Sequence, residues 1–269
     1  MPRIQTILQS STITLLILFA VGFFSKASAQ VVVYEDYVPE KKFIYKKEWG
    51  LKLYVHTGGF GGGFEYGWFD KKARYSGWNI DILTQWSPKR FKYASPAGGR
   101  SFVYGMLAQF GMMRGGYGTS ITLHEKPFWG GVQISMLVNG GFSLGFRFPQ
   151  YLYVIYATGE IDPVTEEPVL EISLEKYDPN ADHFQRGNII ARGPYFSSWK
   201  GLRPYPGIYA KTGVAFEFGK IETRTHTLEI GVSYDFYFTG IPLFAKAGAQ
   251  WGFLNFFLSY RFGMRSGIR

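Results

Sequence analysis

Residues 228–238 read LEIGVSYDFYF, and apolar and polar side chains alternate along most of this stretch. A β-strand points successive side chains to opposite faces, so the pattern predicts a strand with one apolar face and one largely polar face. The even positions form the apolar face: Leu228, Ile230, Val232, Tyr234, Phe236 and Phe238. A tilted strand crosses a bilayer in about 9 to 11 residues, so this segment has the length of one membrane crossing.

The same alternation recurs along the chain. Residues 210–218 repeat it, and only residues 220–223 separate the two segments, which predicts a hairpin with a tight turn. The further segments are 49–57, 62–69, 78–86, 102–113, 131–148 and 253–263. In the fourth strand along the chain the apolar face is predicted to hold Phe102, Tyr104, Met106, Ala108, Phe110 and Met112.

These eight segments predict the fold class: all-β, an eight-stranded antiparallel transmembrane β-barrel over residues 49–264, with a C-terminal tail at 265–269. An even number of antiparallel strands closes without an exposed edge, and a bilayer requires every backbone donor and acceptor to be paired. Ten strands stay an alternative, because the fifth segment can continue through residues 151–156. With a periplasmic N-terminus, the short turn at 220–223 is periplasmic and the long loop at 158–206 is extracellular.

The first 29 residues are interpreted as a cleaved signal peptide. An apolar run at 13–24 precedes Ala27-Ser28-Ala29, the small-x-small pattern of a cleavage site. The alternative is a transmembrane anchor, but the run is well short of the roughly 20 residues that a helix needs to cross a bilayer. Residues 30–48 then form a periplasmic segment. The chain has no cysteine, which excludes disulfides, a lipoprotein anchor and thiolate metal sites.

Composition favours the same class. Aromatic residues make up 19% of the chain, glycine occurs 34 times and the mean hydropathy is -0.06, as expected where lipid-facing aromatics alternate with small or polar interior residues. The net charge of +9 raises the alternative of a nucleic-acid partner. The basic residues are dispersed and form no recognisable binding motif, so no nucleic-acid partner is predicted.

The polar faces distinguish a membrane barrel from a soluble exported barrel of the lipocalin type. A water-facing exterior is usually dense in Lys and Glu, whereas these faces are mostly Gly, Ser, Asn and Gln with a few charges of both signs. Charges inside a narrow barrel need partners, because an unpaired buried charge costs several kcal/mol. The predicted lumen charge network is Lys52, Glu65, Asp81, Arg147, Lys211, Glu217, Glu229, Asp235 and Arg261.

No catalytic, cofactor-binding or metal-binding residue is predicted. The four histidines have no metal-ligand spacing, and the glycine-rich residues 58–63 lack the lysine and helix of a phosphate loop, so they indicate a hairpin. Calcium is an alternative at Asp178, Asn180 and Asp182, which alternate but lie in no EF-hand loop. The lumen carboxylates would need a poised serine or histidine for catalysis, and none stands out.

The long loop combines acidic and aromatic residues. A purely solvated loop does not need exposed aromatic side chains, so this one either packs over the barrel mouth or docks to a partner. The predicted contact residues are Tyr195, Phe196, Trp199 and Tyr205.

Four segments carry a family resemblance: the first hairpin at 51–69, KPFWGG at 126–131, EKYDP at 175–179 and YPGIYAK at 205–211. In these the chain resembles a family of exported outer-membrane barrels of about 250 residues in Bacteroidota. The resemblance covers most of the mature chain and supplies no catalytic residue. It implies an accessory subunit of a larger envelope machine, such as one for barrel assembly or secretion.

The sequence leaves three hypotheses about function. The leading hypothesis is a non-catalytic outer-membrane barrel that is a structural or accessory subunit of a larger envelope complex. The second is a stand-alone barrel or pore for small solutes, and the third is an enzyme that modifies lipid or peptide. The predicted partners are outer-membrane lipid and an envelope protein complex, with no cofactor and no small-molecule substrate.

Overall fold

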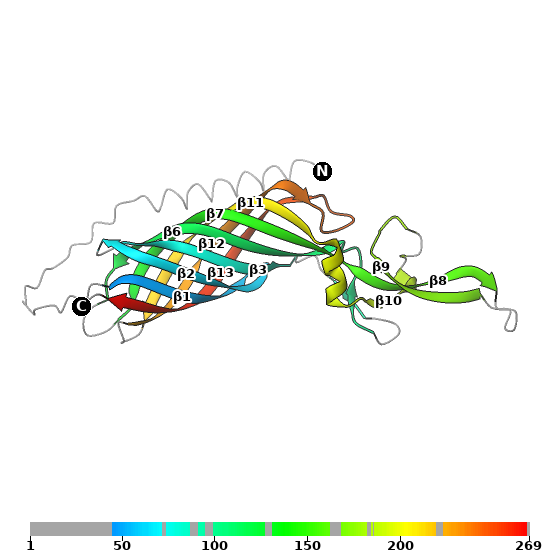
Figure 1. Cartoon of the computed structure of the whole chain (residues 1–269), viewed down its shortest axis with the longest axis horizontal. Helices are drawn as coiled ribbons and strands as arrows, with labels where there is room; N and C mark the ends of the chain where they lie inside the picture. The colour runs from blue at the N-terminus through cyan, green and yellow to red at the C-terminus, as the bar shows by residue number, and fades with distance from the viewer. Residues whose placement is uncertain are drawn as a thin grey trace, which may run out of the picture. The chain divides into compact units, whose positions relative to one another are not determined.

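Eight strands pair in a ring (Figure 1). The computed structural model describes residues 45–71, 74–86, 91–94, 99–126, 131–161, 168–181, 184, 186–218 and 223–267. The barrel strands are β1 (Tyr45–His56), β2 (Gly59–Lys71), β3 (Arg74–Gln85), β6 (Ala108–His124), β7 (Gln133–Pro149), β11 (Arg203–Phe218), β12 (Arg224–Ile241) and β13 (Gln250–Gly267). The order around the closed barrel is β1-β13-β12-β11-β7-β6-β3-β2, with antiparallel neighbours throughout. The predicted eight-stranded fold is confirmed.

Alternation along each strand separates a lumen face from an exterior face. On β1, Leu51, Leu53 and Val55 are exposed while Lys52 and Tyr54 are buried inside. The glycines of β2 make room in the lumen. A Cβ atom at Gly63 would overlap the Asp81 carboxylate, and one at Gly67 would overlap the Tyr75 ring. The glycine-rich residues therefore belong to a strand and its hairpin, as predicted.

The fourth barrel strand lies further along the chain than predicted. β6 covers Ala108–His124 rather than residues 102–113, and Phe102–Val103 form the short strand β5, which pairs with β4 (Lys92–Tyr93). The apolar side chains Ala108, Phe110 and Met112 point into the lumen and not toward the exterior. The shift has a physical reason: the second half of β6 is rich in Gly, Ser and Thr and carries no strong apolar alternation.

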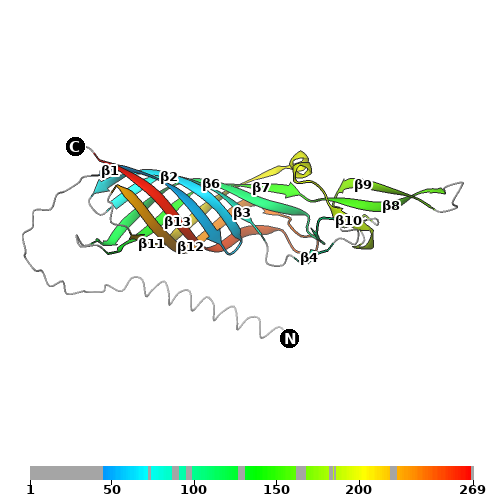
Figure 2. The ribbon, with the colours of Figure 1, turned by 90° about the horizontal axis from the view of Figure 1, so that it is seen from below.

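The two ends of the barrel differ in their connections. One end, here called the terminal end, holds the start of β1, the end of β13 and the strand ends that connect β2 with β3, β6 with β7 and β11 with β12. The other, here called the loop end, holds the hairpin tip at 57–58 and the longer connections 86–107, 150–202 and 242–249. Figure 2 shows the same arrangement from below. The barrel spans 45–267 instead of 49–264, so part of the predicted C-terminal tail belongs to β13.

The long connection at the loop end is folded. β8 (Tyr151–Ile161), β9 (Pro168–Lys176) and β10 (Ile189–Arg192) form a three-stranded sheet in the order β10-β8-β9, and the 3-10 helices η2 (Arg186–Asn188) and η3 (Tyr195–Gly201) lie in the same connection. Its core comprises Phe102, Leu152, Val154, Tyr177, Phe184 and Ile189. We call the sheet, β4–β5 and η3 the loop-end subdomain. The extra strands belong to this sheet, so the barrel count is eight.

The predicted signal peptide and most of the predicted periplasmic segment lie outside the described residues, which begin at Tyr45. Among the described residues, no helix is long and apolar enough to cross a bilayer.

Candidate functional site

The lumen begins at the terminal end with a cluster of four charged side chains. Arg265 on β13 donates from Nε to Glu48 at 2.7 Å and from Nη1 to Glu217 at 3.0 Å. Arg261, further along the same face of the strand, contacts Glu48 through Nη1 at 2.8 Å. Both carboxylates are buried, and each has an arginine partner, so this end of the lumen is closed by paired charges.

A second charged layer crosses the middle of the lumen. Lys52 on β1 pairs with Glu65 on β2 and, at 3.0 Å, with Glu229 on β12. Glu229 also accepts from the Ser259 hydroxyl at 2.9 Å and lies 3.7 Å from the Lys211 ammonium. Strands β1 and β12 are separated by β13 in the ring, so the Lys52–Glu229 ion pair joins two strands that do not pair with each other.

A tyrosine links this layer to a carboxylate above it. Lys211 donates to the Tyr54 hydroxyl at 2.8 Å, and Tyr54 donates to Asp81 at 3.2 Å. Asn79 donates to the Tyr209 hydroxyl at 2.7 Å beside them. Asp81 is completely buried and reaches its cation through the Tyr54 hydroxyl rather than by direct contact.

The third charged layer is a single two-pronged ion pair. Arg114 on β6 donates to Asp235 on β12 from Nε at 2.8 Å and from Nη2 at 2.5 Å, and the Ser143 hydroxyl donates to the same carboxylate at 3.1 Å. Arg114 is 2% exposed and Asp235 is not exposed at all. A planar guanidinium matches a carboxylate in this geometry, which is the strongest form of a protein ion pair.

Aromatic side chains fill the lumen between this pair and the loop end. Phe110 packs edge-on against Tyr237 with ring centroids 5.4 Å apart and stacks with Phe253 at 5.3 Å. At the terminal end, a cavity lined by Glu48, Arg265 and their neighbours has a volume of about 30 Å³. An enclosed water molecule needs about 10–15 Å³ of such space, so this cavity has room for about two water molecules beside the charged cluster.

The structure brings eight of the nine predicted lumen residues into this network, and places Arg147 apart from it. Arg147 lies at the loop end, where its Nε donates to the carbonyl of Pro242 at 2.9 Å. Three further members of the network were not predicted: Glu48, Arg114 and Arg265. Each of them lies just outside a predicted strand. In the longer strand of the structure, each occupies one of the alternate positions whose side chains point into the lumen.

The loop-end subdomain is tied to the barrel by main-chain hydrogen bonds. The Leu107 amide donates to Leu243 at 2.8 Å, and the Gln150 amide donates to Leu107 at 2.9 Å. The Tyr177 amide donates to Gln150 at 2.9 Å. Burial, and then the neighbouring Tyr104, raise the pKa of Tyr177, so its hydroxyl stays neutral within this joint.

Three of the four predicted contact residues are on the surface. Tyr195, Phe196 and Trp199 lie on η3 and are 62%, 83% and 66% exposed. Tyr205 is a correction: it lies on β11, its side chain is buried in the barrel core, and it cannot form part of a contact surface. The cause is the loop boundary, because β11 begins at Arg203 and not after residue 206.

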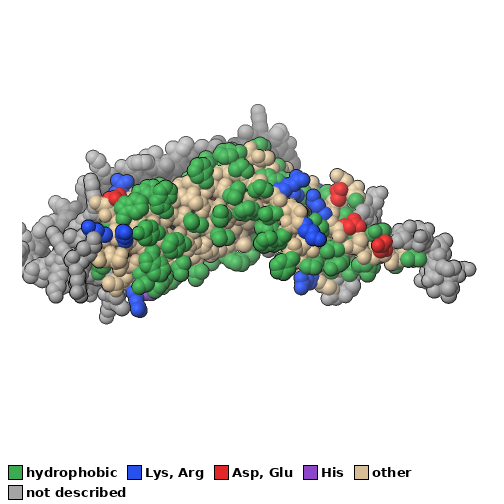
Figure 3. Space-filling model, in the orientation of Figure 1, with side chains coloured by type: hydrophobic (Ala, Val, Ile, Leu, Met, Phe, Trp, Pro, Cys, Tyr) green, Lys and Arg blue, Asp and Glu red, His purple; other side chains and the backbone are tan. Residues whose placement is uncertain are grey.

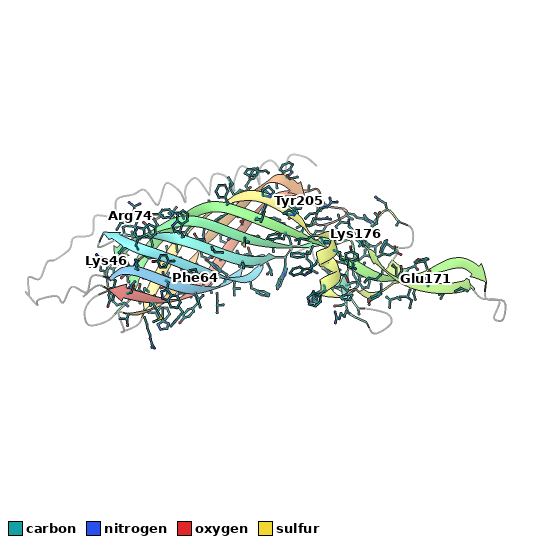
Figure 4. All side chains as sticks on the ribbon, viewed as in Figure 1. Lys46, Phe64, Arg74, Glu171, Lys176 and Tyr205 are labelled. Atoms are coloured by element: carbon teal, nitrogen blue, oxygen red, sulfur yellow. The ribbon has the colours of Figure 1, made fainter. Side chains whose placement is uncertain are left out.

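A second apolar surface, which the sequence pattern did not single out, lies on β8 and β9. Leu170, Ile172 and Leu174 alternate along β9, so their side chains share one face of the sheet, and Ile172 and Leu174 pair with Ile155 and Tyr153 on β8. Leu170 and Ile172 are 60% and 59% exposed. We call Leu170, Ile172 and Leu174 the β9 face. Figure 4 places Glu171 and Lys176 on this part of the molecule, away from Lys46 and Arg74 at the terminal end.

Nothing in the described residues assembles a metal site of three or more His, Cys, Asp or Glu side chains. Asp178 Oδ1 accepts from the Asn180 amide at 3.0 Å in a local turn, and Asp182 lies outside the described residues. His226 on the barrel exterior shares a 2.7 Å hydrogen bond with the Tyr260 hydroxyl.

No protein-family model matches the chain, and no characterised protein matches it in sequence. The crystal structure of Neisserial surface protein A (NspA) is similar with a TM-score of 0.37 and 9% identity, over 82% of this chain and 97% of that chain. A major outer membrane protein from Thermus thermophilus gives 0.44 and 9%, over 82% and 99%. Ail, the attachment invasion locus protein of Yersinia pestis, gives 0.34 and 9%, over 82% and 97%. Values this low carry no argument about function, and the fold rests on the strand pairing.

Proposed function

We propose that this chain is an outer-membrane barrel with its terminal end in the periplasm and its loop end outside the cell. The barrel exterior supports the placement: large apolar side chains are exposed around the wall, among them Leu53, Ile82, Phe142 and Phe256. Figure 3 shows hydrophobic side chains over much of the visible face of the wall, with Lys and Arg toward its two ends. Soluble monomers rarely expose apolar patches of more than a few hundred Å², whereas lipid requires such a surface.

Exposed aromatic side chains lie toward both ends of the barrel wall, where the edges of a bilayer would be. Trp49, Tyr66, Trp78 and Tyr117 are paired in register across β1, β2, β3 and β6 on the exterior. Trp86, at the end of β3, is exposed near the loop end. A strand rises about 3.3 Å per residue and barrel strands tilt by about 35–45°, so Trp78 and Trp86 lie roughly 20 Å apart along the barrel axis. This is close to the apolar band of about 25 Å in outer-membrane barrels.

The proposed role is a non-catalytic structural or accessory subunit of a larger envelope complex. The observation that carries it is the loop-end subdomain, which has its own core and hydrogen bonds to the barrel and still exposes large apolar side chains on η3 and on the β9 face. Contiguous exposed apolar side chains on a folded surface are typical of protein contact sites. Membership of the Bacteroidota barrel family named above is part of the same proposal.

We expect a change on the β9 face to release the partner. The substitution Ile172→Asp places a charge in that face, and the matched control Glu171→Gln alters the neighbouring residue, whose side chain points to the opposite face. A buried unpaired charge in an interface costs several kcal/mol, so the partner recovered with the tagged chain from native membranes is expected to fall at least tenfold for Ile172→Asp.

The readout is quantitative mass spectrometry of the proteins that co-purify in mild detergent. Glu171→Gln should retain the partner at the level of the unaltered chain. A third variant, Phe196→Asp, separates a contact through η3 from one through the β9 face. Recovery of the barrel alone from the unaltered strain would contradict the accessory role for any complex that survives detergent.

The alternative of a pore for small solutes makes a different prediction. Because the lumen is crossed by three layers of ion pairs and an aromatic plug, we expect no discrete conductance from the purified full chain in a planar bilayer. Stable single-channel steps would contradict the closed lumen and favour the pore. The enzyme alternative finds little support, since Glu229 and Asp235 are both held in ion pairs inside the lumen.

A further inference from the structure

The barrel wall is lower at one place on the loop end. The tip of the β1–β2 hairpin ends level with Phe256 and Trp86: the Thr57 amide donates to the Phe256 carbonyl at 3.0 Å, and the Trp86 amide donates to Gly58. Strand β13 begins six residues before Phe256, at Gln250. Gln250 and residues 252–255 pair with β12 on one side, whereas the register with β1 ends at Phe257.

This gap holds a cavity of about 330 Å³, here called the lateral notch. Trp86 and Leu254 line its mouth and are exposed on the barrel exterior. Leu243 and Phe253 line its back and are only 4% and 7% exposed, because they belong to the barrel core. The notch therefore connects the lipid-facing wall with the apolar plug of the lumen.

Uncharged amides supply the polar part of the notch. Gln85 and Gln250 both line it. Asn255 donates to the Gln85 side chain at 3.0 Å, and Thr57 donates to Asn255 at 3.3 Å, so a hydrogen-bonded bridge runs from β3 to β13 above the hairpin tip. Among the described lining residues there is no Asp, Glu, Lys or Arg. The site is built for an apolar group with an uncharged polar end.

We propose that the lateral notch binds one hydrocarbon chain of an outer-leaflet lipid, with the ester or amide of that chain beside Gln85 and Gln250. This inference rests on the proposed membrane placement, because the mouth then opens into lipid at the level of Trp86. The volume lies at the lower end of the range for small-molecule sites, about 300–1,000 Å³, which suits a single chain rather than a whole lipid. Leu243 and Phe253 offer the apolar contact at the back of the site.

Photocrosslinking tests the proposal through those two side chains. The full chain is reconstituted in phosphatidylcholine vesicles that contain phosphatidylcholine with a diazirine on one acyl chain, and adducts are mapped by peptide mass spectrometry. Lipid around the barrel reaches exposed residues such as Val138 in any case, whereas Leu243 and Phe253 are nearly buried and, among the described residues, face lipid through the notch. We expect adducts on Leu243 and Phe253 in addition to those on the exterior wall.

A filling variant provides the control. Gln250→Trp occupies the notch, and Val138→Trp adds the same bulk to the exterior of β7. Adducts on Leu243 and Phe253 should fall about tenfold in Gln250→Trp, the factor expected for losing the burial of about two methylene groups. They should be unchanged in Val138→Trp. Retained unfolding midpoints in urea show that both variants are folded.

The outcomes separate this proposal from the membrane placement. Adducts on the exterior wall with none on Leu243 or Phe253 would overturn the lipid site and leave the placement intact. Adducts at those two residues that persist in Gln250→Trp would also overturn it, because the chain then reaches the core by another route. An absence of adducts everywhere would overturn both.

Discussion

Asp235→Asn is expected to lower the free energy of unfolding by about 3–5 kcal/mol, because it leaves the Arg114 guanidinium buried without a counter-charge. Asp235 accepts two hydrogen bonds from Arg114, at 2.8 Å and 2.5 Å, and neither side chain is more than marginally exposed. Asparagine keeps the shape of the side chain, so the loss reports the charge and not a cavity. Urea unfolding of the reconstituted barrel measures it.

The double variant Arg114→Met with Asp235→Leu removes both charges and keeps apolar volume. We expect it to be more stable than Asp235→Asn, because replacing a whole buried ion pair by apolar side chains is often close to neutral. Asp178→Asn on the exposed loop is the matched control and should change the free energy of unfolding by less than about 0.5 kcal/mol. If Asp235→Asn is as stable as the Asp178→Asn control, the buried ion pair does not stabilise the barrel as expected here.

The alternation of side chains along each strand explains why most of the charged lumen residues were predictable from the sequence. Once residues 228–238 are read as one strand, Glu229 and Asp235 must share a face, and the same rule places Lys52 and Arg261. For Glu48 and Arg265 the rule failed through strand length, because both lie just beyond a predicted segment. β13 runs to Gly267 because the wall extends beyond the alternating apolar segment, so Arg265 fell into a predicted tail.

The aromatic plug and the loop-end subdomain were less accessible to sequence analysis. Apolar alternation indicates that a strand has two faces, but it does not say which face meets lipid. Phe110 and Met112 follow the same pattern as lipid-facing residues and yet fill the lumen, because an eight-stranded barrel needs side chains to occupy its interior. The subdomain depends on contacts between distant segments, such as Phe102 with Ile189 in one core, that no local pattern carries.

The second large effect is expected on the exterior wall. Ile82 lies midway between Trp78 and Trp86 on β3 and is 64% exposed, which puts it near the centre of the proposed lipid belt. Ile82→Arg should lower the free energy of unfolding in phosphatidylcholine vesicles by about 2–4 kcal/mol, the cost of a cation on the lipid face of a barrel at the bilayer midplane.

Phe196→Arg is the matched control, because Phe196 is still more exposed but lies on η3, which follows β10 of the loop-end subdomain outside the belt. Its free energy of unfolding should change by less than about 0.5 kcal/mol. In water both substitutions would place a cation on an exposed surface at little cost. The difference between the two changes in the free energy of unfolding therefore reports whether Ile82 faces water or hydrocarbon. A large difference is expected only if Ile82 faces hydrocarbon. Equal changes would exclude the membrane placement on which the proposed function depends.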